Sequence, residues 1–163
     1  MLIRLKNKDT LIVDNFTFKC CIGKNGIKSK KIEGDYSTPR GLFSLDKIYY
    51  RPDRVKKPIT KLPLKKISKN LGWCNDVRSK LYNSEITTQL NLKHEKLFRK
   101  SNNYDYFLVI NYNIKKIPFK GSAIFIHLTK NYKPTEGCIA LEYSDLIEII
   151  SNMPENCFIT ISP

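Results

Sequence analysis

Near its C-terminal end the chain reads Gly121-Ser122-Ala123-Ile124-Phe125-Ile126-His127, and after ten intervening residues comes Cys138, within Pro134-Thr135-Glu136-Gly137-Cys138-Ile139-Ala140-Leu141. This region contains two short apolar runs, residues 123–128 and 139–141, and each predicts a buried strand. His127 lies at the end of the first run, and Cys138 lies directly before the second. If the two strands are neighbours joined by the polar loop between them, His127 and Cys138 lie close together.

The residue types in this region are those of a nucleophilic site. A thiol with the ordinary pKa of about 8.5 is mostly protonated at neutral pH, and a histidine within hydrogen-bond reach can remove its proton. Gly137 permits a tight turn, which lets backbone N–H groups face a developing oxyanion. We therefore take Cys138, His127 and Gly137 as candidate catalytic residues. The structural alternative is that Cys138 is only a small buried hydrophobic residue.

A second informative stretch lies about a hundred residues upstream: Gly34-Asp35-Tyr36-Ser37-Thr38-Pro39-Arg40-Gly41-Leu42-Phe43. Its glycines, its proline and its aspartate predict a loop between strands.

Together the two stretches resemble the L,D-transpeptidase catalytic-domain (YkuD-like) family. The upstream motif of that family is matched at six positions, namely Gly34, Asp35, Thr38, Pro39, Gly41 and Phe43. The downstream motif is matched by Thr135, Gly137, Cys138 and Ile139, with His127 as the preceding histidine. Two positions depart from the pattern, since Glu136 stands where a second histidine is usual and Ala140 where asparagine is usual. The loop is also shorter than usual, as in a short branch of the family.

The fold class expected is mostly β, because short strands and frequent turns dominate the chain. The resemblance covers about residues 30–161 and implies one β-sandwich-like catalytic domain, 1–163, with a few short helices. The choice between a sandwich and a partly closed barrel stays open at this point.

The resemblance also implies a reaction. Cys138, deprotonated by His127, would attack a peptidoglycan stem peptide at the bond between a diamino acid and D-Ala, forming a thioester. Transfer of the acyl group to an amine would be an L,D-transpeptidation, and transfer to water would be an L,D-carboxypeptidase step, in cell-wall synthesis or recycling. We expect no cofactor and no metal, because zinc-ligand spacing is absent.

The segment between the two motifs is expected to fold over the active-site cleft. The substrate-binding candidates are Thr135, Glu136, Trp73, Asp76, Tyr82, Asn83, His94, Glu95 and Arg40, and Arg51 or Arg99 could add positive charge. The structural alternative is that the tryptophan is core and the His94–Glu95 pair is surface. For Glu136 two roles are open: orienting His127, or facing outward from a turn at Gly137 toward Lys133 or an ammonium group of the substrate.

The chain of 163 residues carries 29 basic and 15 acidic residues, a formal net charge of +14. Such a charge suggests an anionic partner, so a basic nucleic-acid-binding module is an alternative function. However, the basic residues are spread along the chain without an arginine-rich stripe, and we do not expect nucleic acid as a partner. An inactive peptidoglycan-peptide binder is a further alternative, because of Glu136 and Ala140.

Five cysteines without a Cys-x-x-Cys pair indicate a reducing compartment, with one reactive thiol among structural ones. No apolar run approaches the ~20 residues of a membrane span, and the N-terminus lacks the apolar core of a signal peptide. We expect a cytoplasmic protein if Met1 is the natural start, and otherwise a periplasmic one. The oligomeric state stays open.

Other patterns predict individual elements. Strands are expected at residues 2–5, 10–13, 16–22, 45–51, 106–112 and 157–161. A helical turn is expected at 94–99, and a helix capped by Ser144 over 144–150.

Overall fold

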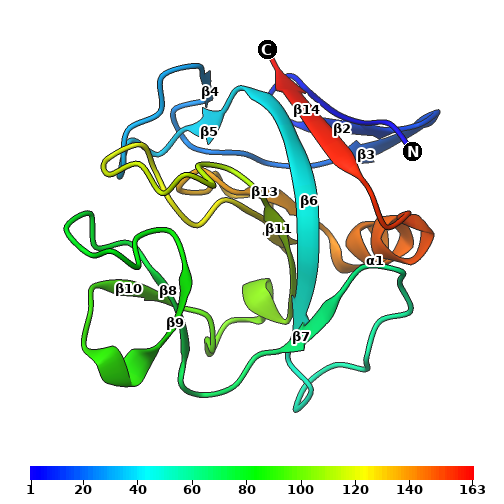
Figure 1. Ribbon diagram of the computed structural model, residues 1–163. Helices are drawn as coiled ribbons and strands as arrows, with labels where there is room; N and C mark the ends of the chain where they lie inside the picture. The colour runs from blue at the N-terminus through cyan, green and yellow to red at the C-terminus, as the bar shows by residue number, and fades with distance from the viewer.

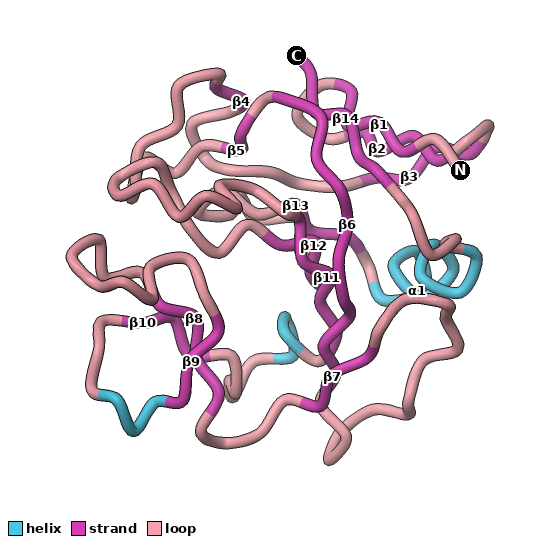
Figure 2. Tube along the Cα trace, in the orientation of Figure 1, coloured by secondary structure: helices cyan, strands magenta, loops and turns pink.

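The structure of the protein is a computed structural model that describes residues 1–163. Strands dominate it, with a single α-helix and two 3-10 turns, which confirms the mostly β prediction (Figures 1 and 2). The elements in chain order are β1 (Ile3–Lys6), β2 (Thr10–Val13), β3 (Phe16–Lys19), β4 (Ile27–Lys28), β5 (Thr38–Pro39), β6 (Gly41–Tyr50), β7 (Leu64–Lys66), β8 (Leu71–Cys74), β9 (Glu85–Thr87), η1 (Thr88–Leu90), β10 (His94–Lys96), η2 (Asn102–Tyr104), β11 (Tyr106–Ile110), β12 (Phe125–Leu128), β13 (Ile139–Leu141), α1 (Tyr143–Asn152) and β14 (Phe158–Ser162).

The ten-residue strand β6 joins the two halves of the main sheet, and Figure 1 shows it running the length of the molecule. Its first half pairs with β14, from Gly41↔Ile161 to Ser44↔Phe158. Its second half pairs with β11 on one side and with β7 on the other. The resulting order is β13-β12-β11-β6-β14-β1-β2-β3.

The two ends of this sheet meet. Just beyond β3, the Cys21 N–H donates to the Ala140 carbonyl over 2.9 Å, and the Ala140 N–H donates back over 2.8 Å. Ala140 lies in β13, at the opposite end of the strand order. The main sheet therefore curls round until its edges are bridged, and the architecture that the sequence left open is barrel-like.

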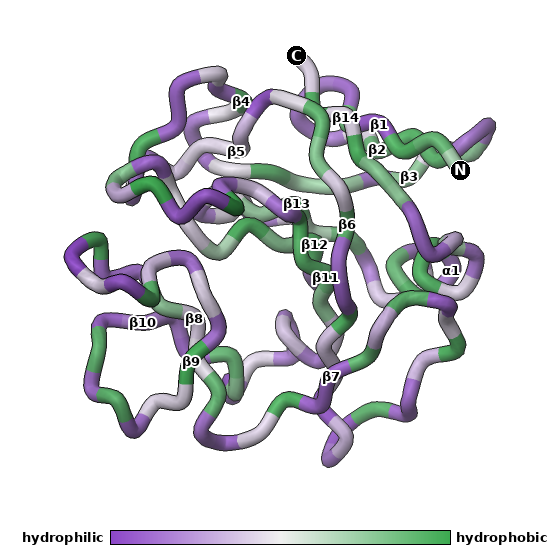
Figure 3. The backbone as a smooth tube through the Cα atoms, in the orientation of Figure 1, coloured by the Kyte–Doolittle hydropathy of each residue, from purple (hydrophilic) through white to green (hydrophobic).

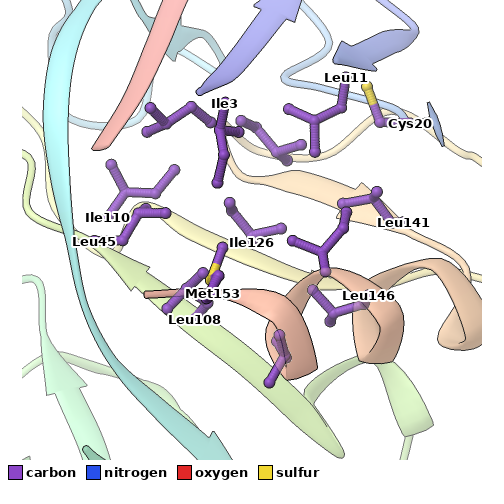
Figure 4. Close-up of a cluster of buried hydrophobic side chains, with 14 of the residues drawn as sticks. Ile3, Leu11, Cys20, Leu45, Leu108, Ile110, Ile126, Leu141, Leu146 and Met153 are labelled. Carbon is purple, nitrogen blue, oxygen red and sulfur yellow. The ribbon is translucent and has the colours of Figure 1, made fainter. Parts of the chain in front are cut away.

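Strands β11 and β12 are buried on both faces, which explains why each reads as a continuous apolar run. Figure 3 shows hydrophobic residues along both strands. Alternate residues of β12 face different clusters: Ile126 and Leu128 join the core inside the sheet, whereas Phe125 joins a second cluster outside it. The inner core includes residues from both ends of the chain, such as Ile3 and Met153 (Figure 4).

The outer cluster is covered by the small sheet β10-β8-β9 and by η2. Trp73 of β8 packs edge-on against Phe125, with ring centroids 5.1 Å apart. Helix α1 covers the inner core instead, with Leu146, Ile149 and Ile150 buried. No helix of the structure has the length and apolarity that crossing a membrane requires.

Several predicted elements differ from the observed ones. Residues 94–96 form the strand β10, paired with β8, rather than a helical turn, because pairing partners outweigh local propensity in a three-residue segment. Helix α1 begins at Tyr143, and its N-cap residue is Glu142, not Ser144. Strand β12 begins only at Phe125, since Ala123 has a positive φ of 53° that no regular strand accommodates.

Candidate active site

Cys138 lies immediately before β13, and its side chain is held by backbone groups of Ala123 and of Phe125, the first residue of β12. Its Sγ donates to the Ala123 carbonyl and accepts the Phe125 N–H, both at 3.3 Å. The residue is 8% exposed and lines a cavity of about 710 Å³. The thiol is thus fixed by two backbone groups while one side of it faces the cavity.

The surroundings of Cys138 keep it protonated. Burial, followed by the negative charge of Glu95, raises the pKa of the thiol to about 12. The Phe125 N–H and the positive charges of Arg99 and Lys31 act in the opposite direction. In the free protein Cys138 is therefore a thiol, not a preformed thiolate, and would need a base to act as a nucleophile.

His127 lines the same cavity, at a position that strand pairing fixes. Strands β12 and β13 are parallel neighbours, with Ile126 opposite Ile139 and His127 opposite Ala140. His127 shares the face of β12 that carries Phe125, which packs in the same outer cluster as Cys138. Both His127 and Cys138 line the cavity, and the role of the two as a catalytic pair stays a prediction.

The ring of His127 is oriented by its neighbours. Its Nδ1 lies 2.9 Å from the Leu128 carbonyl, an acceptor only, so Nδ1 carries the proton and Nε2 is free to accept one. Tyr104 of η2 flanks the ring at 5.2 Å between centroids. Burial lowers the pKa of His127 to about 4, against the effect of the Leu128 carbonyl, so the imidazole is neutral at physiological pH.

The backbone at Gly137 leaves one donor free beside the thiol. The Gly137 N–H donates to the Thr135 hydroxyl at 3.1 Å, and that hydroxyl donates to the Cys138 carbonyl at 2.5 Å. The Cys138 N–H has no acceptor within the chain. This N–H is therefore a candidate donor to an oxyanion.

Residues of the upstream motif contact the turn at Gly137. The Thr38 hydroxyl donates to the Gly137 carbonyl at 2.8 Å and accepts the Gly23 N–H at 3.0 Å. Gly137 has a φ of +142°, and a Cβ added to it would lie 2.8 Å from the Ser37 carbonyl oxygen. The two stretches of sequence therefore meet, and residues 37 and 38 shape the turn that leads into Cys138.

We expect Gly137→Ala to lower the free energy of unfolding by more than the ~1–3 kcal/mol of backbone strain alone, because the added methyl group also meets the Ser37 carbonyl. Urea denaturation checks this. Gly26→Ala is the matched control, since Gly26 also has a positive φ, +74°, but a Cβ there meets only the end of Lys8 at 3.8 Å. Equal destabilisation by the two substitutions would contradict the steric explanation.

The rest of the cavity is lined by charged groups of both signs. Five are basic and three acidic: Lys31, Lys93, Arg99, Lys130, Lys133, Glu33, Glu95 and Glu136. Beside His127, the Glu95 carboxylate accepts hydrogen bonds from the Tyr104 hydroxyl and from Arg99, the latter at 2.7 Å. Arg99 also lies over the Tyr104 ring, 4.1 Å from its centroid. The cavity can therefore recognise a ligand with both ammonium and carboxylate groups.

The structure separates the predicted substrate-binding residues into two sets. Thr135, Glu136 and Glu95 line the cavity with Cys138 and His127. The other six do not line it: Trp73, Asp76, Tyr82, Asn83, His94 and Arg40.

Five of these six residues have structural partners. Asn83 accepts hydrogen bonds from the Trp73 indole and the Ala123 N–H, and so holds the segment whose carbonyl binds the thiol. Tyr82 accepts from the Gly121 N–H and donates to Glu33. The remaining three lie elsewhere: Asp76 accepts the Arg78 N–H in a turn, His94 packs on Gly72, and Arg40 is exposed. Arg51 is also outside the cavity, paired with Asp53.

Lys31, Glu33 and Tyr104 line the cavity but were not among the predicted residues. Lys31 stands four residues before the motif aspartate Asp35, but outside a helix this spacing gives no signal of a contact. The chain has no group of three or more His, Cys, Asp or Glu side chains placed to hold a metal ion.

Comparison with known protein families agrees with this geometry. The model of the YkuD family, the L,D-transpeptidase catalytic domain, matches residues 2–161, which is nearly the whole chain and more than the 30–161 recognised from the motifs. The comparison with curated proteins gives no match. A buried cysteine directly before β13 and a histidine on the neighbouring strand β12 line one cavity, next to the upstream Thr-Pro motif. The chain that carries them matches the family model over nearly its whole length, and the protein belongs to the L,D-transpeptidase catalytic-domain (YkuD) family.

Proposed function

We propose that the protein is a cysteine acyltransferase that acts on peptidoglycan stem peptides at the bond between a diamino acid and D-Ala. The family as a whole acts on peptidoglycan peptides. The observation that carries the proposal is that Cys138 and His127 both line one charged cavity. The Nε2 of His127 is free to accept a proton, because Nδ1 bonds to the Leu128 carbonyl.

In the proposed reaction, Nε2 of His127 takes the proton of the Cys138 thiol as the sulfur attacks the scissile carbonyl. The oxyanion accepts a hydrogen bond from the Cys138 N–H. When the C–N bond breaks, the imidazolium returns the proton to the leaving amine of D-Ala, and the acyl group stays on Cys138 as a thioester. An amine or a water molecule then attacks the thioester while His127 removes the proton of that second nucleophile. The C–S bond breaks, the acyl product leaves, and the Cys138 sulfur takes the proton back from the imidazolium.

The cavity supports a zwitterionic substrate of this kind. A stem peptide carries carboxylates and, on its diamino acid, an ammonium group. Basic residues such as Arg99 and Lys130 and acidic residues such as Glu136 face the same space of about 710 Å³. Complementary charges favour capture and orientation of such a ligand.

The test is incubation of the purified protein with a disaccharide-tetrapeptide, followed by mass spectrometry. A thioester adduct on Cys138 with release of D-Ala is the expected result. A disaccharide-tripeptide product would identify an L,D-carboxypeptidase, and a cross-linked dimer an L,D-transpeptidase. Failure to form either product or an adduct would overturn the proposal.

One observation favours a second candidate, a binder of stem peptides without turnover. Both hydrogen bonds of the Cys138 sulfur go to backbone groups rather than to His127, and burial keeps the thiol protonated. Saturable binding of the tetrapeptide without an adduct would support this candidate.

Glu136 is expected to act in binding rather than in the chemical step. It is exposed at the cavity, forms no ion pair with Lys133, and precedes the turn at Gly137 that breaks strand alternation. We expect Glu136→Gln to raise KM for the tetrapeptide more than it lowers kcat, because an exposed carboxylate contributes chiefly to uniform binding. Steady-state kinetics measure both constants.

The control for Glu136 is Glu148→Gln, an exposed carboxylate on α1 outside the cavity, which should change neither constant. A loss of ~10²-fold or more in kcat at unchanged KM would place Glu136 in the chemical step instead.

A further inference from the structure

Lys31 is a buried lysine at the reaction end of the cavity. Its side chain is only 4% exposed, although lysine is almost never buried without a partner. It lines the same cavity as Cys138 and His127. Neither the reaction proposed above nor the family motifs assign it a role.

Two glycines make room for this side chain. A Cβ added to Gly121 would lie 2.9 Å from Cε of Lys31, so the aliphatic part of the lysine rests on the Gly121 backbone. A Cβ added to Gly137 would lie 3.6 Å from the Lys31 Nζ. The ammonium group is therefore beside the backbone of the residue that precedes the nucleophile.

Asp35 holds Lys31 in this position. The carboxylate of Asp35 accepts the Lys31 Nζ at 2.8 Å, the Ile32 N–H at 2.9 Å and the Ser37 N–H at 3.0 Å. Burial alone would raise the pKa of Asp35, but these hydrogen bonds lower it to about 2, so the carboxylate is ionised. Asp35 is a positioning residue that anchors the lysine to the loop of the upstream motif.

The ion pair between Lys31 and Asp35 uses only part of the hydrogen-bonding capacity of the ammonium group. An ammonium has three N–H donors, and Asp35 receives one of them. The other two have no acceptor in the chain, yet the side chain is almost fully buried. A buried ammonium group with unused N–H donors beside Gly137 can stabilise a negative charge that develops near Gly137 only during a reaction.

We propose that Lys31, positioned by Asp35, is the charge-stabilising residue of the active site, which favours the Cys138 thiolate and the oxyanion that follows it. The other charged or polar groups near the sulfur are Glu95, Arg99, His127 and Tyr104. The charge of Glu95 disfavours the thiolate and the charge of Arg99 favours it. However, Arg99 already donates hydrogen bonds to the Glu95 carboxylate and to the Lys96 carbonyl. Lys31 is the cation that lies next to Gly137, the residue before the proposed nucleophile, and still has N–H donors without an acceptor.

The test needs no peptidoglycan substrate. Iodoacetamide, a neutral reagent, alkylates the thiolate, so its rate with Cys138 reports the thiolate fraction, and mass spectrometry of the peptide that contains Cys138 separates this thiol from the other four. Between pH 7 and 9 we expect Lys31→Met to slow this alkylation about tenfold, since the loss of one nearby charge raises a pKa by about one unit.

Lys133→Met is the matched control: it removes the same charge from an exposed lysine of the same cavity and should leave the rate within about twofold. Lys31→Arg keeps the charge and should stay closer to the wild-type rate than Lys31→Met. If circular dichroism shows that Lys31→Met does not fold, Lys31→Gln replaces it, because the amide can still donate to Asp35 without carrying charge. An unchanged alkylation rate in a folded, neutral variant would overturn the proposal.

The role in the oxyanion step rests on the proposed function, and kinetics with the tetrapeptide test it separately. Lys31→Met should lower kcat more than it raises KM. A raised KM with unchanged kcat and unchanged alkylation would mean that Lys31 binds a substrate carboxylate, contrary to our inference. If the wild-type protein does not turn over the peptide but alkylation depends on Lys31, the proposed function fails while the effect of Lys31 on the thiolate stands.

Discussion

Replacement of Cys138 by alanine is expected to abolish turnover of the disaccharide-tetrapeptide, with a loss on the order of 10⁴-fold or more, because no other group can form the acyl-enzyme. Cys138→Ser should be nearly as inactive, since a hydroxyl has a far higher pKa than a thiol and His127 is a weak base. The thioester adduct seen by mass spectrometry should be absent from both variants.

The fold should survive these changes. Serine can keep the hydrogen bonds that Sγ makes with the Ala123 carbonyl and the Phe125 N–H, and alanine leaves only a small space beside the cavity. Thermal unfolding monitored by circular dichroism checks this.

Cys74→Ala and Cys157→Ala are the controls for Cys138, because both residues are buried cysteines outside the cavity. Activity that survives in Cys138→Ala and disappears in either control would show that the nucleophile is a different thiol.

The second large effect is expected at His127. We expect His127→Ala or His127→Gln to lower kcat by at least ~10²-fold with little change in substrate binding, the usual scale for loss of a general base. His94→Gln is the control, since His94 is the other histidine of the chain and lies in β10 outside the cavity. Equal losses in the two variants would contradict the assignment of His127 as the base.

His127 also makes a prediction that does not depend on the substrate. Its pKa is about 4 in the folded protein, below the ordinary value of 6.5, because burial disfavours the charged ring. The unfolded chain therefore binds more protons than the folded protein between these values. The contribution of His127 to stability is complete above pH 6.5 and is lost as the pH falls toward 4, by on the order of 2 to 3 kcal/mol at pH 4.5.

Urea denaturation of the wild-type protein and of His127→Gln at pH 7 and pH 4.5 measures this effect by difference. The comparison is needed because the pKa of Glu95 is raised by burial, so its protonation favours the folded protein in the same range. The variant should lose less stability on acidification than the wild type. An equal loss would mean that His127 is not buried as a neutral ring.

The candidate residues Cys138 and His127 could be named from the sequence because the evidence for them is local. Cys138 follows a glycine at the start of an apolar run, and His127 ends the preceding run; both facts depend on neighbouring residues alone. The burial of β11 and β12 on both faces also follows from their unbroken apolar composition. The mostly β character of the chain, though not the boundaries of each strand, could be predicted in the same way.

The lining of the cavity depends on contacts between residues far apart in the chain, and only the tertiary structure decided it. Thr38 bonds to the Gly137 carbonyl across 99 positions, and no periodicity reports such a contact. Trp73 and Asn83, which the sequence suggested as pocket residues, do not line the cavity; Asn83 bonds to Trp73 and to the Ala123 N–H of the segment that does. Lys31 and Tyr104, which the sequence did not suggest, line it. Closure of the sheet between Cys21 and Ala140 is of the same kind, because hydrogen bonds between distant backbone groups leave no mark on side-chain composition.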